Sequence, residues 1–110
     1  MSKVGIVKDR DFQAKIRLSK GVKLVDFWAP WCGPCKKLGP ILEQVAERLG
    51  DDAAVYKLNV EDNPTCAAKY RVRSIPTMMV FMDEDLVETV TGLRTADEIE
   101  KMVRKYILSE

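Results

Sequence analysis

The chain contains 110 residues, of which 46% are hydrophobic and 32% are charged, and its formal net charge is +1. These values predict one globular domain over residues 1–110, and the even spread of charge excludes a basic stripe for nucleic acid. No apolar run approaches the length of a membrane span, and residues 1–5 begin no signal peptide, so we expect a protein of the reducing cytoplasm.

Strands and helices alternate through the first half of the chain. The sequence predicts a strand at 4–7, followed by a helix for which Asp9 is the N-cap. An apolar strand at 22–28 leads into a longer helix, which opens near Pro34 and ends at Gly50. Because the segment 22–28 is apolar on both faces, we expect it at the centre of a sheet, with helices covering both sides.

The second half of the chain predicts a short helix between a strand and a hairpin. The strand covers 53–59. The short helix runs to Tyr70 from Asn63-Pro64, where asparagine is the predicted N-cap and proline the first helical residue. Strands at 77–82 and 86–91 lie close enough in sequence to pair as an antiparallel hairpin.

The hairpin turn and the last helix complete the predicted elements. Asp83-Glu84-Asp85 contains no glycine, so we expect an acidic turn that is longer than a tight primed turn. Thr95 and Glu98 form a capping-box pattern in front of a helix with one apolar face. Together the elements predict a mixed α/β sheet, with a parallel core and antiparallel strands added at one side.

The segment Trp31-Cys32-Gly33-Pro34-Cys35 places two thiols three positions apart, where the central strand meets a helix. Thiolate is the form that attacks disulfides, and a helix N-terminus stabilises it. We therefore predict that Cys32, at the cap position, is the nucleophile. Cys35 lies inside the first turn and is the predicted resolving thiol, which attacks the mixed disulfide and releases the reduced product.

A zinc site and a purely structural disulfide are the alternatives for this pair. The chain has no histidine and no second Cys-x-x-Cys, so only Cys66 or carboxylates could complete a zinc ligand set, and we expect no metal. A structural role is also disfavoured, because so short a loop constrains the unfolded chain little. Cys66 is interpreted as a small buried hydrophobe, with a regulatory or dimer-forming thiol in the first turn of its helix as the alternative.

Residues 25–35 resemble the active-site segment of the thioredoxin family, and the resemblance covers nearly the whole chain. It continues in the same order through further positions: Pro40, Lys57, Asn63-Pro64, Lys69-Tyr70, Ser74-Ile75-Pro76-Thr77 and Gly92. It implies the thioredoxin fold, a central mixed five-stranded sheet flanked by four helices. It also implies a monomeric protein-disulfide reductase that acts on disulfide-containing client proteins and binds no cofactor. Re-reduction is then by a separate thioredoxin reductase, usually a flavoprotein that uses NADPH.

The resemblance also assigns roles to residues around the dithiol. Asp26 is a carboxylate in an apolar strand, so burial should raise its pKa, although the pattern alone also allows a strand-end aspartate that reaches water. The resemblance implies that Asp26 accepts the proton of Cys35. It also implies that Lys57 lies beside Asp26, although the strand pattern alone would allow Lys57 to face solvent. A cis peptide bond at Ile75-Pro76 is implied as well. The implied contact surface for clients comprises Trp31, Gly33, Pro34, Ile75, Pro76 and Gly92.

Three other functions are compatible with parts of this pattern. The same fold could be poised as an oxidant or isomerase, which depends on its reduction potential. It could be a binding module in which turnover is incidental. A glutaredoxin-like role is disfavoured, because Gly33-Pro34 lacks the aromatic residue usual between glutaredoxin cysteines. Gly33-Pro34 favours the reductant.

Overall fold

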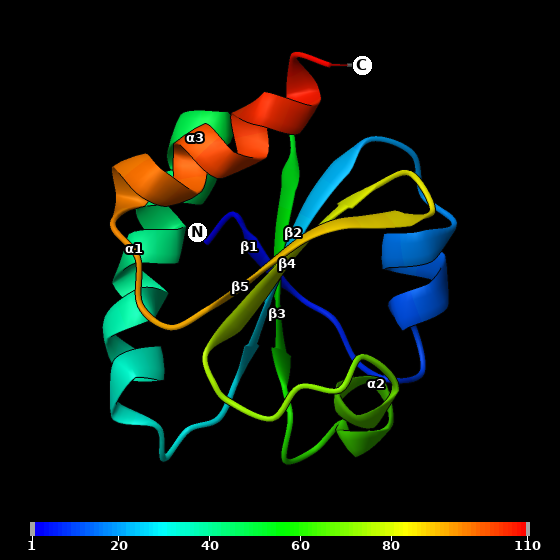
Figure 1. Ribbon diagram of the computed structural model, residues 1–110, viewed down its shortest axis with the longest axis vertical. Helices are drawn as coiled ribbons and strands as arrows, with labels where there is room; N and C mark the ends of the chain where they lie inside the picture. Colours follow the sequence, from blue (N-terminus) through cyan, green and yellow to red (C-terminus); the bar gives the residue numbers. More distant parts are fainter. Residues whose placement is uncertain (1, 110) are drawn as a thin grey trace.

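The computed structural model describes residues 2–109, which form a sheet of five strands in the order β1-β3-β2-β4-β5 (Figure 1). β1, β3 and β2 are parallel, whereas β4 pairs antiparallel with both β2 and β5. The mixed sheet predicted from the sequence is therefore confirmed. Its strands are β1 (Val4–Ile6), β2 (Val22–Trp28), β3 (Ala54–Asn59), β4 (Thr77–Met82) and β5 (Asp85–Thr91).

Helices cover both faces of this sheet. In Figure 1, α1 and α3 lie together to the left of the strands, and the η1 and α2 helices lie to the right. Each pair covers a separate apolar cluster of buried side chains, one on each face of the sheet. The helices are η1 (Gln13–Arg17, a π-helix), α1 (Gly33–Leu49), α2 (Pro64–Lys69) and α3 (Ala96–Ile107).

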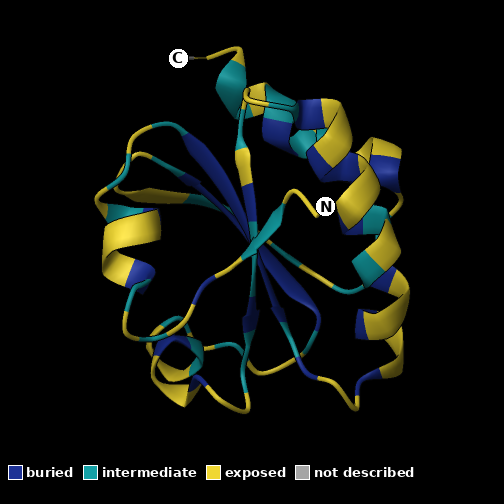
Figure 2. Cartoon of the chain, turned by 180° about the vertical axis from the view of Figure 1, so that it is seen from behind, coloured by how far each residue is buried: buried dark blue, intermediate teal, exposed yellow. Residues whose placement is uncertain are grey.

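β2 lies at the centre because its side chains serve both clusters. Leu24 packs in the cluster beneath α1 and α3, whereas Val25 and Phe27 pack in the cluster beneath η1 and α2. Residues 22–27 are all buried, and Figure 2 shows such strands in dark blue between the exposed outer faces of the helices. The predicted central strand is confirmed with the predicted bounds.

Local capping signals predicted the ends of the two long helices correctly. The Thr95 side chain accepts a hydrogen bond from Glu98 N (3.1 Å), and Thr95 N donates to Glu98 Oε1 (2.9 Å), which completes the capping box of α3. Cys32 is the N-cap of α1, and Gly50 ends that helix with φ at 55°, in the left-handed region that glycine tolerates best.

Asp9 caps α2 and not the helix that follows it in the chain. Its Oδ2 accepts a hydrogen bond from Thr65 N (3.0 Å), and its Oδ1 accepts one from Cys66 N (2.9 Å). Asn63 stands at the N-cap position but does not cap α2, because its Oδ1 accepts from Asp9 N (2.9 Å) and its Nδ2 donates to Asn59 O (3.0 Å). The prediction for Asp9 is thus wrong. Asn63 and Pro64 hold their predicted positions at the N-cap and in the first turn of α2, but a side chain from a distant segment makes the capping hydrogen bonds.

The turn between β4 and β5 is tight, and the expectation of a longer turn is wrong. β4 ends at Met82 and β5 begins at Asp85, its pairing partner. Asp83 adopts φ of 52°, which aspartate tolerates better than most residues. Its Oδ1 accepts from Gly21 N (2.8 Å), its N donates to Gly21 O (3.0 Å), and its carbonyl accepts from Lys23 Nζ (2.9 Å). These contacts stabilise a turn that lacks glycine.

Replacing Asp83 by alanine should lower the free energy of unfolding by about 2 kcal/mol, because alanine tolerates positive φ poorly and cannot accept the hydrogen bond from Gly21. Asp83→Asn, which retains both properties, should stay close to the original protein. Glu84→Ala is the matched control, since the contact of Glu84 with Arg17 uses its backbone carbonyl. Urea denaturation measures all three; equal losses for Asp83→Ala and Asp83→Asn would contradict this account.

Candidate active site

The two cysteines of residues 31–35 lie at the N-terminus of α1, joined as a disulfide with their Cα atoms 5.2 Å apart. Cys35 N donates a hydrogen bond to Cys32 Sγ (3.2 Å), and Lys36 N donates to Cys32 O (3.1 Å). The Cys32 sulfur therefore meets the unpaired amides of the first helical turn, an arrangement that stabilises negative sulfur in the reduced state. Cys32 is 6% exposed and Cys35 only 3%.

Segments far apart in the sequence meet beside Cys32. Its Sγ lies 3.8 Å from the carbonyl oxygen of Ile75, and the Ile75-Pro76 peptide bond is cis, as the resemblance implied. Pro76 O in turn accepts a hydrogen bond from Gly92 N (2.8 Å). Trp31, the residue before Cys32, is 67% exposed. The fold thus brings most of the predicted contact residues to one surface.

Asp26 is buried in β2, with only 2% of its surface exposed. Its Oδ1 has no hydrogen-bond partner among the described residues. Burial raises the pKa of Asp26 from 3.8 to about 7, against the opposing charge of Lys57. The alternative of a strand-end aspartate that reaches water is therefore wrong. A carboxyl group with this pKa can both accept and donate a proton near neutral pH.

Lys57 lies beside Asp26 in the sheet, because the two residues are register partners in the parallel pair of β2 and β3. Its Nζ stands 4.6 Å from the centre of the Trp28 ring, and the side chain is half-buried. A hollow of about 210 Å³ is lined in part by Lys57, Trp28 and Asn59. The lysine is thus placed to moderate the charge of Asp26, as the resemblance implied. Its side chain does not project fully into solvent.

Cys66 lies apart from the dithiol, in the apolar cluster beneath η1 and α2. It is 6% exposed, and burial, together with the nearby Asp9 carboxylate, raises the pKa of its thiol to about 12. The interpretation as a small buried hydrophobe is confirmed. Across residues 2–109 we find no group of three or more metal-ligating side chains. No helix within the same range has the length and apolar character needed to cross a membrane.

Comparison with known proteins identifies the family. The family model described as Thioredoxin matches residues 3–105 of the chain. The chain belongs to the thioredoxin family. The thioredoxin of Bacillus subtilis (strain 168) is 41% identical over 104 residues, which cover 94% of this chain and 100% of that relative. The thioredoxin of Staphylococcus epidermidis (strain ATCC 12228 / FDA PCI 1200) is 46% identical over 101 residues, which cover 92% and 95% of the two chains.

Membership of the thioredoxin family confirms the predicted fold and activity. The five-stranded sheet with four flanking helices is the thioredoxin fold. The chain is a protein-disulfide oxidoreductase, and the Cys32–Cys35 pair is its redox centre. Thioredoxins of this kind reduce disulfides in client proteins and are themselves reduced by a thioredoxin reductase.

Two neighbours of this thioredoxin dithiol, and one neighbour of Gly92, escaped the sequence reasoning. Ala29 and Val60 pack directly with the two cysteines. Arg94 lies against Gly92, since a Cβ atom on that glycine would stand 3.4 Å from Arg94 Nη1. Adjacency to Gly92 in the chain is the one signal that pointed to Arg94, whereas nothing in the local sequence distinguishes Val60.

The ionisation of Asp26 should make the protein less stable at high pH. The folded protein binds the Asp26 proton more tightly than the unfolded chain, so the free energy of unfolding falls as pH rises from about 4 to about 7 and then levels off. Asp26→Asn should remove this fall, and at pH 8 it should be more stable than the original protein by about 4 kcal/mol.

Urea denaturation of the oxidised protein between pH 4 and pH 9 measures this difference. Asp51→Asn, a change of the same chemical kind at an exposed position, is the matched control and should follow the original protein throughout. A constant gap between Asp26→Asn and the original protein at every pH would contradict a raised pKa.

Proposed function

We propose that this protein reduces disulfides in client proteins, with Cys32 as the nucleophile and Cys35 as the resolving thiol. The observation that carries the assignment is the hydrogen bond from Cys35 N to Cys32 Sγ at the first turn of α1 (3.2 Å). It offers a negatively charged sulfur at Cys32 a donor and the positive end of a helix dipole. Cys35 is the more buried of the two, which suits a thiol that reacts only after the client is bound.

The reaction then proceeds in two exchanges. The Cys32 thiolate attacks one sulfur of the client disulfide, and the other client sulfur leaves as a thiolate. Cys35 next loses its proton and attacks the Cys32 sulfur of the mixed disulfide. The first client sulfur leaves as the Cys32–Cys35 bond forms, so the client gains two electrons and the protein loses them.

Asp26 is the proposed acceptor of the Cys35 proton in the second exchange. A carboxylate with a pKa of about 7 holds a proton far more strongly than an exposed one, and its unpaired Oδ1 is available to bind it. Lys57, the register partner of Asp26, keeps the pKa from rising further and so keeps part of the carboxylate ionised at neutral pH.

The proposed client surface surrounds Cys32 and comprises Trp31, Gly33, Pro34, Ile75, Pro76 and Gly92. Trp31, Gly33 and Pro34 are exposed, and the Ile75 carbonyl lies close to the Cys32 sulfur. An extended client segment that pairs with the backbone at Ile75 would place its own sulfur in front of Cys32, in the manner of an added strand.

The wider setting is also proposed from the family. The protein would act in electron transport and in redox homeostasis in the cytoplasm, as a monomer made of one domain over residues 1–110. Electrons would come from NADPH through the flavin of a thioredoxin reductase, with no cofactor bound to the chain itself. Neither nucleic acid nor a membrane is a proposed partner, since the net charge of +1 offers neither a strong electrostatic attraction.

The reduction potential of the Cys32–Cys35 pair tests the direction of electron flow. A value of about −270 mV, characteristic of thioredoxins, is expected for a reductant. Equilibration against a glutathione buffer or a reference dithiol, followed by separation of the oxidised and reduced protein, measures it. A value above about −200 mV would instead assign the protein to oxidants or isomerases.

Single-turnover kinetics with a fluorescent disulfide peptide test the roles of the side chains. Asp26→Asn should slow the second exchange by about tenfold, because no internal group takes the Cys35 proton, and should leave the first exchange nearly unchanged. Cys35→Ser should stop at the mixed disulfide, which provides the reference for a blocked second step. Equal rates of resolution in Asp26→Asn and the original protein would remove Asp26 from the mechanism.

A further inference from the structure

The client surface has acidic residues on one side of β2 and arginines on the other. In the strand order, β3 lies on one side of β2, and β4 and β5 lie on the other. Val60 N donates to Trp28 O (2.9 Å), so Glu61 and Asp62 follow close to the end of β2 on the β3 side. Arg73 and Arg94 lie on the opposite side, beside the segments that lead into β4 and out of β5.

Arg94 stands against the backbone of the client surface. Gly92 N is hydrogen-bonded to Pro76 O (2.8 Å), and a Cβ atom on Gly92 would lie 3.4 Å from Arg94 Nη1. That nitrogen donates to Leu93 O (3.0 Å). Glu88 and Glu98 line a hollow together with Arg94, and Glu98 Oε1 already accepts from Thr95 N (2.9 Å). Glu88 is bound by Lys105 (2.9 Å) and Tyr106 (2.6 Å), so the Arg94 guanidinium keeps donors for a carboxylate that approaches across the surface.

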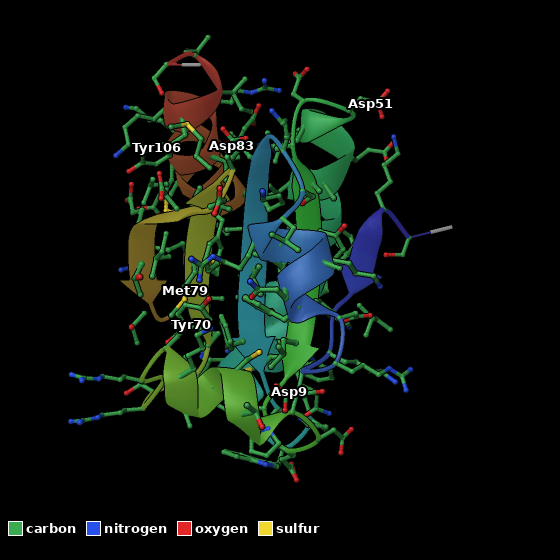
Figure 3. The ribbon with its side chains drawn as sticks, turned by 90° about the vertical axis from the view of Figure 1, so that its right-hand side faces the viewer. Asp9, Asp51, Tyr70, Met79, Asp83 and Tyr106 are labelled. Carbon is green, nitrogen blue, oxygen red and sulfur yellow. A yellow bond between two sulfur atoms is a disulfide. The ribbon has the colours of Figure 1, made fainter. Side chains whose placement is uncertain are left out.

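Arg73 lies on the same side and reaches solvent. It is exposed and precedes Ile75, whose carbonyl lies 3.8 Å from Cys32 Sγ, by two positions. Within residues 2–109, neither Arg73 nor Arg94 forms an ion pair. Figure 3 labels Tyr70, which ends α2 three positions before Arg73.

Two arginines on the other face of the sheet from α2 are held by acidic partners, unlike Arg73 and Arg94. Arg48 pairs with Asp97 (2.7 Å), and Arg104 pairs with Glu100 (2.8 Å), where α1 and α3 lie together. Their charges are balanced within the protein. The two arginines beside the client surface thus keep a positive charge that an incoming segment can meet.

We propose that Arg73 and Arg94 select client segments that carry a glutamate or aspartate beside the reactive cysteine; this rests on the function proposed above. An extended segment at Ile75 and Pro76 passes between the two arginines, and arginine binds carboxylates with paired hydrogen bonds. Glu61 and Asp62 repel a client carboxylate on the other side of β2. An acidic residue is therefore recognised on only one side of the client cysteine. Complementary charge of this kind raises the rate of association.

Three disulfide peptides test the proposal, with glutamate before the cysteine, glutamate after it, or glutamine at both positions. At low ionic strength, one glutamate peptide should be reduced about tenfold faster than the glutamine peptide. The advantage should shrink at about 0.5 M salt, where charges are screened over a few ångströms. In the double variant Arg73→Gln, Arg94→Gln, the ratio of the two rates should fall to near one.

The ratio is taken within each variant, so that any general loss of activity cancels. The double variant Lys20→Gln, Lys101→Gln removes the same charge from exposed positions outside the client surface, and should keep the full preference. The proposal is overturned if neither glutamate peptide reacts faster than the glutamine peptide, or if the preference survives the loss of both arginines. Failure to reduce even the glutamine peptide would instead contradict the proposed function.

Discussion

Burial of β2 on both faces is the constraint on which the rest of the structure depends. A strand that is apolar on both sides needs two layers of helices, and the chain provides them with α1 and α3 on one face and with η1 and α2 on the other. The end of this same strand then leads directly into the turn before α1. The redox pair therefore sits at the N-terminus of a helix that is held in place by the apolar cluster it shares with α3 and the sheet.

The same burial raises the pKa of Asp26 and lowers the stability of the fold. A central strand made only of apolar residues would be more stable, yet Asp26 occupies one of its inward positions, and its Oδ1 has no hydrogen-bond partner among the described residues. The protein holds this carboxyl group with its pKa near 7, where burial favours the acid and Lys57 favours the ion. Stability is lost to obtain a group that can exchange protons inside the core.

Polar contacts between distant segments fix the start of α2 and the turn between β4 and β5. Asp9 satisfies the first amides of α2, while Asn63 satisfies the amide of Asp9, so neither side chain caps the helix that follows it in the chain. At the far end of β2, Gly21 and Lys23 hold Asp83 in a left-handed conformation. Each contact joins groups more than fifty positions apart in the chain. Such contacts depend on the pairing of strands that are distant in the chain, as β2 and β4 are at Gly21 and Asp83.

Much of this protein was determined by local sequence alone. The bounds of β2, the cap of α1, the capping box of α3 and the pairing of Cys32 with Cys35 follow from periodicity and from contacts within a few residues. Only the tertiary structure decided that Asp26 is buried, that Asp9 caps α2, that Asp83 forms a tight turn and that Arg94 reaches Gly92. The physical reason is the same in each case: burial and long-range hydrogen bonds depend on which segments meet, and no single stretch of sequence contains that information.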